Sequence, residues 1–205
     1  MKKILFSLLI SGLFATPVLA NPYVSGSVGS GSLADSDITL AGQPVVIKFK
    51  SGVPFSGAIG FKEDLYRVEA AIGYQSNDLD SVKFGASPVQ ASTGASVSIF
   101  SYLVNGYYDV DLKGSVAPYV TAGIGGASIT MKSTANPDQS KSGLAYQFGA
   151  GIGVKASENM VFDLGYRYFK TTSKDAEFHT NSSDTVLADV PVASHHFMAG
   201  VRYSF

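Results

Sequence analysis

A strict alternation of apolar and non-apolar residues runs through most of this chain and constrains its fold more than any other feature. In residues 144–155, one face carries Leu144, Tyr146, Phe148, Ala150, Ile152 and Val154, and the other carries Ala145, Gln147, Gly149, Gly151, Gly153 and Lys155. Successive side chains of a β-strand point to opposite faces, whereas a helix repeats every 3.6 residues. The period of two therefore predicts an all-β protein.

The alternation predicts eight strands whose connections differ in length. The clearest strands are residues 66–75, 144–155, 160–167 and 196–205. Three weaker ones are 23–30, 54–61 and 97–108, and residues 118–129 complete the eight. Tight turns at 62–64, 111–114 and 157–159 alternate with long polar links at 31–53, 77–95, 130–143 and 170–192. Within the first link, residues 45–49 offer an alternative, an extended strand beyond the membrane. Short turns on one rim and long loops on the other are typical of a transmembrane antiparallel up-and-down β-barrel.

Composition separates this barrel from a soluble one. Only 15% of residues are charged, while the chain has 22 Gly, 11 Tyr and 13 Phe. The non-apolar face is dominated by glycine and alanine, whereas a soluble sheet would present lysine, glutamate and threonine to water. Glycine inside a strand is unfavourable unless another group must pass close by, as in the crowded lumen of a small barrel. Aromatic residues also mark both ends of the apolar face, as expected at two membrane interfaces: Tyr66, Tyr108, Phe162 and Tyr203 on the turn side, and Tyr74, Tyr146, Tyr168 and Phe197 on the loop side.

The first twenty residues predict an export signal. Lys2 and Lys3 precede a short apolar run, and Val18 and Ala20 are the small residues of a cleavage site before Asn21. Residues 1–20 are therefore expected to be removed, leaving 21–205 as the barrel domain. The absence of cysteine excludes disulfides, thiolate zinc sites and a lipid anchor. A near balance of 15 basic and 16 acidic residues excludes nucleic acid as a partner.

The carboxyl terminus resembles the terminal signature of bacterial outer-membrane proteins. The chain ends in Phe205, with Tyr203 and Val201 at alternate positions before it. The resemblance implies that these residues form an assembly signal read by the barrel-assembly machinery, and that the barrel lies in outer-membrane lipid.

Two longer stretches resemble the bacterial surface-antigen family, the small porin-family barrels similar to Wolbachia surface protein. Residues 102–110 and 117–125 resemble the fourth and fifth strands of that family, and residues 143–154 and 164–169 resemble the next two. The resemblance implies a protein of the bacterial outer membrane, with loops exposed at the cell surface and with no cofactor and no catalysis. Its members serve as adhesins, immune targets or narrow porins, so these roles stay open.

Six charged residues are predicted to face the lumen: Arg67, Glu69, Lys155, Asp163, Arg167 and Arg202. Because the third and seventh strands lie opposite each other in an eight-stranded barrel, Arg67 and Glu69 are expected to face Asp163 and Arg167 across the axis. Unpaired charges there would be costly, so we predict a mutual network that plugs the lumen. A narrow porin, with these charges lining an ion path, is the alternative.

A lipid A-modifying enzyme is a more remote alternative. Residues 179–184 and Ser194-His195 supply histidine, serine and an acid near the outer rim. Catalysis would need these groups within hydrogen-bond distance of one another, and the sequence does not give those distances. Adjacent His195 and His196 point to opposite faces of a strand, which disfavours a metal site. Binding of a host or surface ligand is therefore expected in the four long links. Their exposed apolar residues include Val45, Val46, Ile47 and Phe49.

Overall fold

The described part of the chain is almost entirely β-strand in the computed structural model. It comprises residues 21–34, 36–40, 43–84, 87–90, 96–132, 139–172 and 192–205. The predicted signal peptide at 1–20 and most of the last long link, 173–191, lie outside the described residues. Within the described ranges there is no helix long and apolar enough to cross a membrane.

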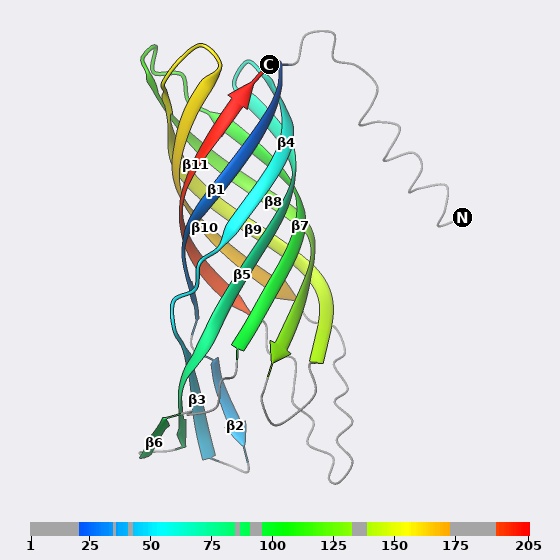
Figure 1. The fold of residues 1–205 in the computed structure, drawn as a ribbon, viewed down its shortest axis with the longest axis vertical. Helices are drawn as coiled ribbons and strands as arrows, with labels where there is room; N and C mark the ends of the chain where they lie inside the picture. Colours follow the sequence, from blue (N-terminus) through cyan, green and yellow to red (C-terminus); the bar gives the residue numbers. More distant parts are fainter. Residues whose placement is uncertain are drawn as a thin grey trace, which may run out of the picture.

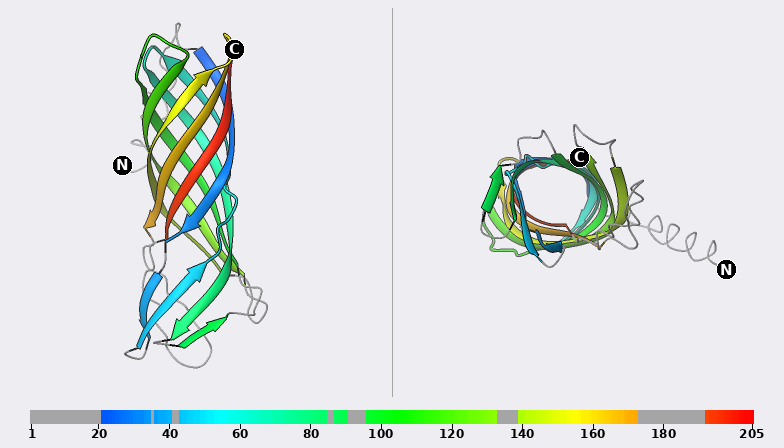
Figure 2. Two further views of the ribbon diagram at one scale, coloured as in Figure 1. Left: turned by 90° about the vertical axis from the view of Figure 1, so that its left-hand side faces the viewer. Right: turned by 90° about the horizontal axis from the view of Figure 1, so that it is seen from below.

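Eight strands form a closed antiparallel barrel (Figures 1 and 2). They are β1 (Asn21–Leu33), β4 (Phe55–Glu63), β5 (Tyr66–Phe84), β7 (Ser96–Asp109), β8 (Val116–Lys132), β9 (Gln139–Lys155), β10 (Met160–Thr172) and β11 (Ala193–Ser204). Each strand pairs with its neighbour in this order, and pairing of β1 with β11 closes the ring. The predicted fold class and all eight predicted strands are confirmed.

The two rims differ as predicted, but the loop side is more ordered than the sequence indicated. On the turn side, Asp64 and Lys113 adopt positive φ angles of 48° and 53° in tight turns. On the other side, β2 (Ser36–Leu40), β3 (Gln43–Phe49) and β6 (Ser87–Gln90) join the outer part of β5 in a small sheet. Residues 45–49 are therefore an extended strand beyond the barrel, which confirms the alternative stated for them.

The outward face of the barrel is an apolar belt with a sharp loop-side edge. On five strands, the first polar outward residue beyond the belt is a serine: Ser30, Ser76, Ser98, Ser128 and Ser142. The belt itself is exposed and aliphatic or aromatic; Ile72 and Phe197, for example, are 59% and 66% exposed. A stretch of about 9–11 residues crosses a bilayer, so the 19 residues of β5 extend well beyond the belt.

Large interior side chains explain several of the strand glycines. A Cβ atom at Gly165 would lie 2.6 Å from Oη of Tyr119, and one at Gly60 would lie 2.6 Å from Cζ of Tyr23. Tyr23 and Tyr119 are both buried inside the barrel. The glycines are therefore needed because the lumen is filled with aromatic rings.

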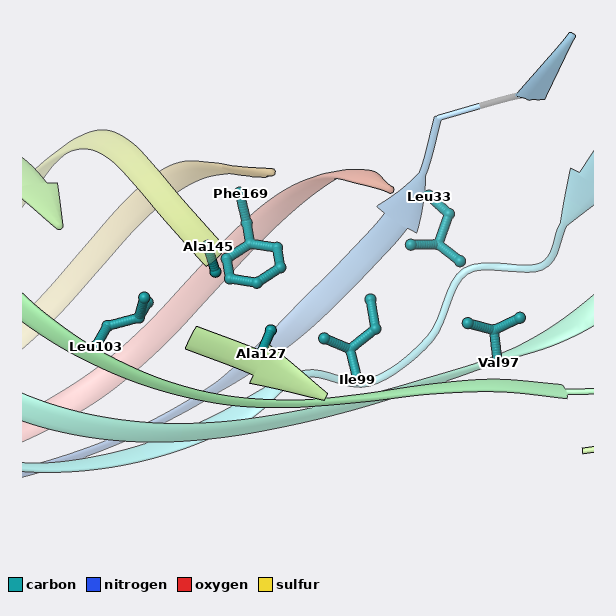
Figure 3. Close-up of a cluster of buried hydrophobic side chains, with 7 residues drawn as sticks. All are labelled: Leu33, Val97, Ile99, Leu103, Ala127, Ala145 and Phe169. Carbon is teal, nitrogen blue, oxygen red and sulfur yellow. The ribbon is translucent and has the colours of Figure 1, made fainter. Parts of the chain in front are cut away.

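An apolar cluster lies in the loop-side half of the interior (Figure 3). Its members come from β1, β7, β8, β9 and β10: Leu33, Val97, Ile99, Leu103, Ala127, Ala145 and Phe169. Phe49 packs against this cluster and is half-buried, so it is not the exposed loop residue that we expected. From the sequence we expected a lumen of charges and small residues, and we did not expect this apolar cluster.

Candidate functional site

The turn-side half of the interior is built around one carboxylate, that of Asp109 at the end of β7. Arg67 on β5 donates to it through Nη2 at 2.8 Å and Nε at 3.0 Å. Lys62 on β4 donates through Nζ at 2.5 Å, and Nη1 of Arg202 lies 4.0 Å away. Three cations therefore surround a single acid that the sequence analysis did not place in the lumen.

Glu69, in contrast, is held by uncharged donors. Its carboxylate accepts hydrogen bonds from the Tyr23 hydroxyl at 3.0 Å and from the Tyr107 hydroxyl at 2.6 Å. Asn105 donates through Nδ2 at 3.1 Å, and Gln147 in turn donates to Asn105 at 2.6 Å. These hydrogen bonds replace those to water that the Glu69 carboxylate loses when it is buried.

The predicted pairing across the axis is not what the structure shows. Asp163 lies 3.5 Å from Arg202 on the adjacent strand, and Arg167 reaches the Tyr107 hydroxyl at 3.5 Å. Arg67 stacks over the Tyr107 ring, with its Cζ 4.1 Å from the ring centre. The charges therefore pair mainly with neighbouring strands and with tyrosines.

Lys155 does not join this network. It is exposed at the turn-side end of β9 and has no side-chain partner among the described residues. The alternation of faces along the strand predicted that Lys155 points into the lumen. Its side chain instead lies at the turn-side rim of the barrel, where it is exposed to solvent. The missed members are Tyr23 on β1 and Tyr107 and Asp109 on β7. Tyr23 and Tyr107 lie within the expected strands on their inward parity, and a strand extended by one residue to Asp109 would have included the carboxylate as well.

A second polar cluster lies deeper toward the loop side and bears on the enzyme alternative. Oγ of Ser194 lies 2.8 Å from Nε2 of His196, and Oε1 of Gln75 lies 2.5 Å from the same nitrogen. Ser194 is completely buried, and Phe169 stacks on His196. His195 points outward, away from Ser194, while residues 179–184 lie outside the described residues. This cluster offers no accessible nucleophile.

The loop-side half of the interior contains a small cavity. This cavity of about 40 Å³ is lined by Gln75, Leu103, Gln147, Arg167, Phe169 and His196, among others. A buried water needs roughly 10–15 Å³ of such volume, so the cavity has room for about three waters. Across the ranges that the structure describes, no group of three His, Asp or Glu side chains could hold a metal ion.

Comparisons with known proteins agree with this architecture. The model of the family described as "Outer membrane protein beta-barrel domain" matches residues 6–205. Outer membrane protein PagN of Salmonella typhimurium is 29% identical over 191 residues, covering 86% of this chain and 78% of PagN.

Two solved barrels share the fold. Neisserial surface protein A superposes with a TM-score of 0.61 at 18% identity, covering 90% of this chain and 97% of the other. Ail, the attachment invasion locus protein of Yersinia pestis, was solved with the heparin analogue sucrose octasulfate. It superposes with a TM-score of 0.51 at 15% identity, covering 90% and 99% of the two chains.

Proposed function

This chain belongs to the outer membrane protein beta-barrel domain family, and from that membership we propose that it is a surface-interaction protein. In this proposal a sealed barrel anchors a loop-side sheet outside the bacterial outer membrane, and that sheet contacts a ligand. The proposal assigns no catalytic step to the protein.

The extension of β5 beyond the apolar belt is the observation that carries the proposal. After Ser76 the strand continues to Phe84, where it pairs with β3 at Val45 and with β6 at Ser87. Four strands, β2, β3, β5 and β6, are therefore joined by backbone hydrogen bonds on the loop side (Figure 1). A two-stranded hairpin is marginally stable in water, whereas three or more strands can hold a defined surface.

The filled interior supports an interaction role over the porin alternative. Solutes would have to pass both the Asp109 network and the apolar cluster around Phe169. An eight-stranded interior is just wide enough for side chains to fill, and the cavity of about 40 Å³ agrees with that limit.

The charge of the loop side bears on the kind of partner. The four long links carry nine acidic residues and seven lysines. A polyanion such as the heparin analogue bound by Ail is attracted by a surface with excess positive charge. We therefore propose a partner that is not a polyanion, namely a protein or neutral glycan on another cell.

The proposal is tested by expressing the protein in a Gram-negative strain that does not itself adhere, and by measuring its adhesion to cultured cells. Cells expressing the protein are expected to bind cultured cells more than cells carrying an empty vector. Replacing residues 36–47 by a short Gly-Ser linker should abolish this gain, while a control replacement of Lys113 by alanine in a turn-side loop should not. Unchanged adhesion in the linker variant, with the barrel still folded, would refute the proposal.

Liposome swelling with the purified, refolded barrel tests the porin alternative separately. We expect no influx of small sugars above that of empty liposomes. Steady influx that is lost in an Arg67→Ala variant would favour the porin instead.

A further inference from the structure

The outward face where β10 meets β11 differs from the rest of the belt edge. On β1, β5, β7, β8 and β9 the first polar outward residue is serine, whereas on β10 and β11 it is Lys170 and His195. We define the β10–β11 patch as Ser32, Tyr166, Tyr168, Lys170 and His195. Register places His195 between Tyr168 on one side and Ser32 on the other, so these side chains are neighbours on one face.

Each polar group of the patch can donate a hydrogen bond, and Lys170 is a cation. Nδ1 of His195 lies 2.6 Å from the Tyr166 hydroxyl, which leaves Nε2 directed away from that contact. In the tautomer whose Nδ1 accepts from the Tyr166 hydroxyl, Nε2 carries the imidazole proton and can donate it to an outside acceptor. Lys170 adds an ammonium group, and the part of the chain that the structure describes gives it no acidic partner. The patch contains no carboxylate.

A shallow apolar groove, open to the surrounding lipid, lies directly below the patch on the lipid face. It has a volume of about 510 Å³ and is lined by Val28, Ala150, Ile152, Leu164, Phe197 and Ala199, together with Tyr166 of the patch. The small outward side chains of Ala150 and Ala199 form its floor, because their neighbours Ile152, Leu164 and Phe197 are larger. Tyr166 and Phe197, whose ring centres lie 5.3 Å apart, join the groove to the patch.

We propose that the β10–β11 patch and this groove form one binding site for a phosphate-bearing lipid of the outer leaflet. The groove takes an acyl chain, and the patch takes the phosphate of the headgroup. Loops longer than turns face the cell exterior in this class of barrel, which places the patch at the outer leaflet. Aromatic rings sit at headgroup depth, and lysine is a common phosphate-binding side chain.

Native mass spectrometry of the refolded barrel in detergent micelles tests the site. The probes are diphosphoryl lipid A and the same lipid stripped of its phosphates. The unmodified barrel is expected to retain the phosphorylated form several-fold more. Lys170→Ala should weaken that binding about five-fold, the contribution of one lysine at a charged membrane surface. His195→Ala should weaken it further.

Two matched controls separate the headgroup from the chain. Lys132→Ala removes an exposed cation from the outer end of β8, two strands away from β10, and should leave binding unchanged. Ala150→Leu fills the groove and should weaken both lipid forms equally, while Ala122→Leu, on the lipid face of β8, should weaken neither. Each variant is first shown to be folded by its heat-dependent gel mobility.

Three results would overturn the site. Equal retention of both lipids by the unmodified barrel would show that the phosphate is not recognised. Unchanged lipid A binding in the Lys170→Ala variant would show that the patch is not part of the site. Displacement of lipid A by an equal concentration of inorganic phosphate would show that the acyl chain contributes nothing.

Discussion

Arg67 and Asp109 form a buried ion pair between β5 and β7, with Nη2 and Nε of the guanidinium 2.8 Å and 3.0 Å from Oδ1 of the carboxylate. Both side chains are almost fully buried, at 3% and 4% exposure. Removing one member of such a pair leaves an uncompensated charge in a medium that solvates it poorly.

Asp109→Ala is therefore expected to lower the free energy of unfolding by about 3–5 kcal/mol. Urea titration in micelles, followed by the gel mobility of the folded barrel, measures this loss. Glu158→Ala, at an exposed turn, is the control and should change stability by less than about 0.5 kcal/mol. A loss in Asp109→Ala no larger than in the control would show that the buried pair of Arg67 and Asp109 does not stabilise the barrel.

Because Gly165 lies against Tyr119, we expect a second substitution at Tyr119 to restore the stability lost in a Gly165 variant. Gly165→Ala should destabilise the barrel by about 1–3 kcal/mol, because its Cβ would meet the Tyr119 hydroxyl at 2.6 Å. Adding Tyr119→Phe should restore most of this loss, since the next ring atom lies 3.6 Å from the Cβ. Gly26→Ala is the control, as its Cβ would meet nothing within 4 Å. If the double variant is as unstable as the sum of the single variants, the steric explanation is wrong.

Substitution of Phe169 measures how much the apolar cluster contributes to the free energy of unfolding. Phe169 is 3% exposed inside the barrel, so Phe169→Ala should cost about 3–5 kcal/mol through lost burial and the cavity left behind. Phe148→Ala, on the lipid face at 56% exposure, should cost less. Equal losses in the same urea titration would mean that the interior cluster is not close-packed.

Phe205 predicts an effect on assembly and not on the folded state. Phe205 is 69% exposed on the outer face of the last strand. If it is part of an assembly signal, Phe205→Ala should reduce the fraction of folded barrel in cell membranes several-fold while leaving urea stability after refolding almost unchanged. Phe61→Ala, another exposed aromatic on the turn side, serves as the comparison. Normal folded yield in cells would argue against the signal.

Single cysteines test the orientation in the membrane, since the natural chain has none. Lys132→Cys on the loop side should react with a membrane-impermeant maleimide on intact cells. Glu158→Cys on the turn side should react only after the outer membrane is broken. The reverse pattern would invert the barrel and place the β10–β11 patch in the inner leaflet.

For the interior of the barrel, the sequence predicted which charged residues face inward but not which of them pair. Parity correctly assigned Arg67, Glu69, Asp163, Arg167 and Arg202 to the inward face. It did not find their partners, because the stagger between strands determines which inward residues lie at the same height. For this reason Arg67 was expected to meet Asp163, whereas its ion pair is with Asp109.

The sequence by itself determined where the centres of the eight barrel strands lie and which of their residues form the apolar belt. These follow from a local rule, since each side chain of a strand points to the face opposite its neighbour's. Only the tertiary structure decided how the lumen is filled, with ion pairs and tyrosines toward the turns and the cluster around Phe169 toward the loops. It also brought Lys170 and His195 together above an apolar groove, because contacts between strands depend on register and closure, which no single strand encodes.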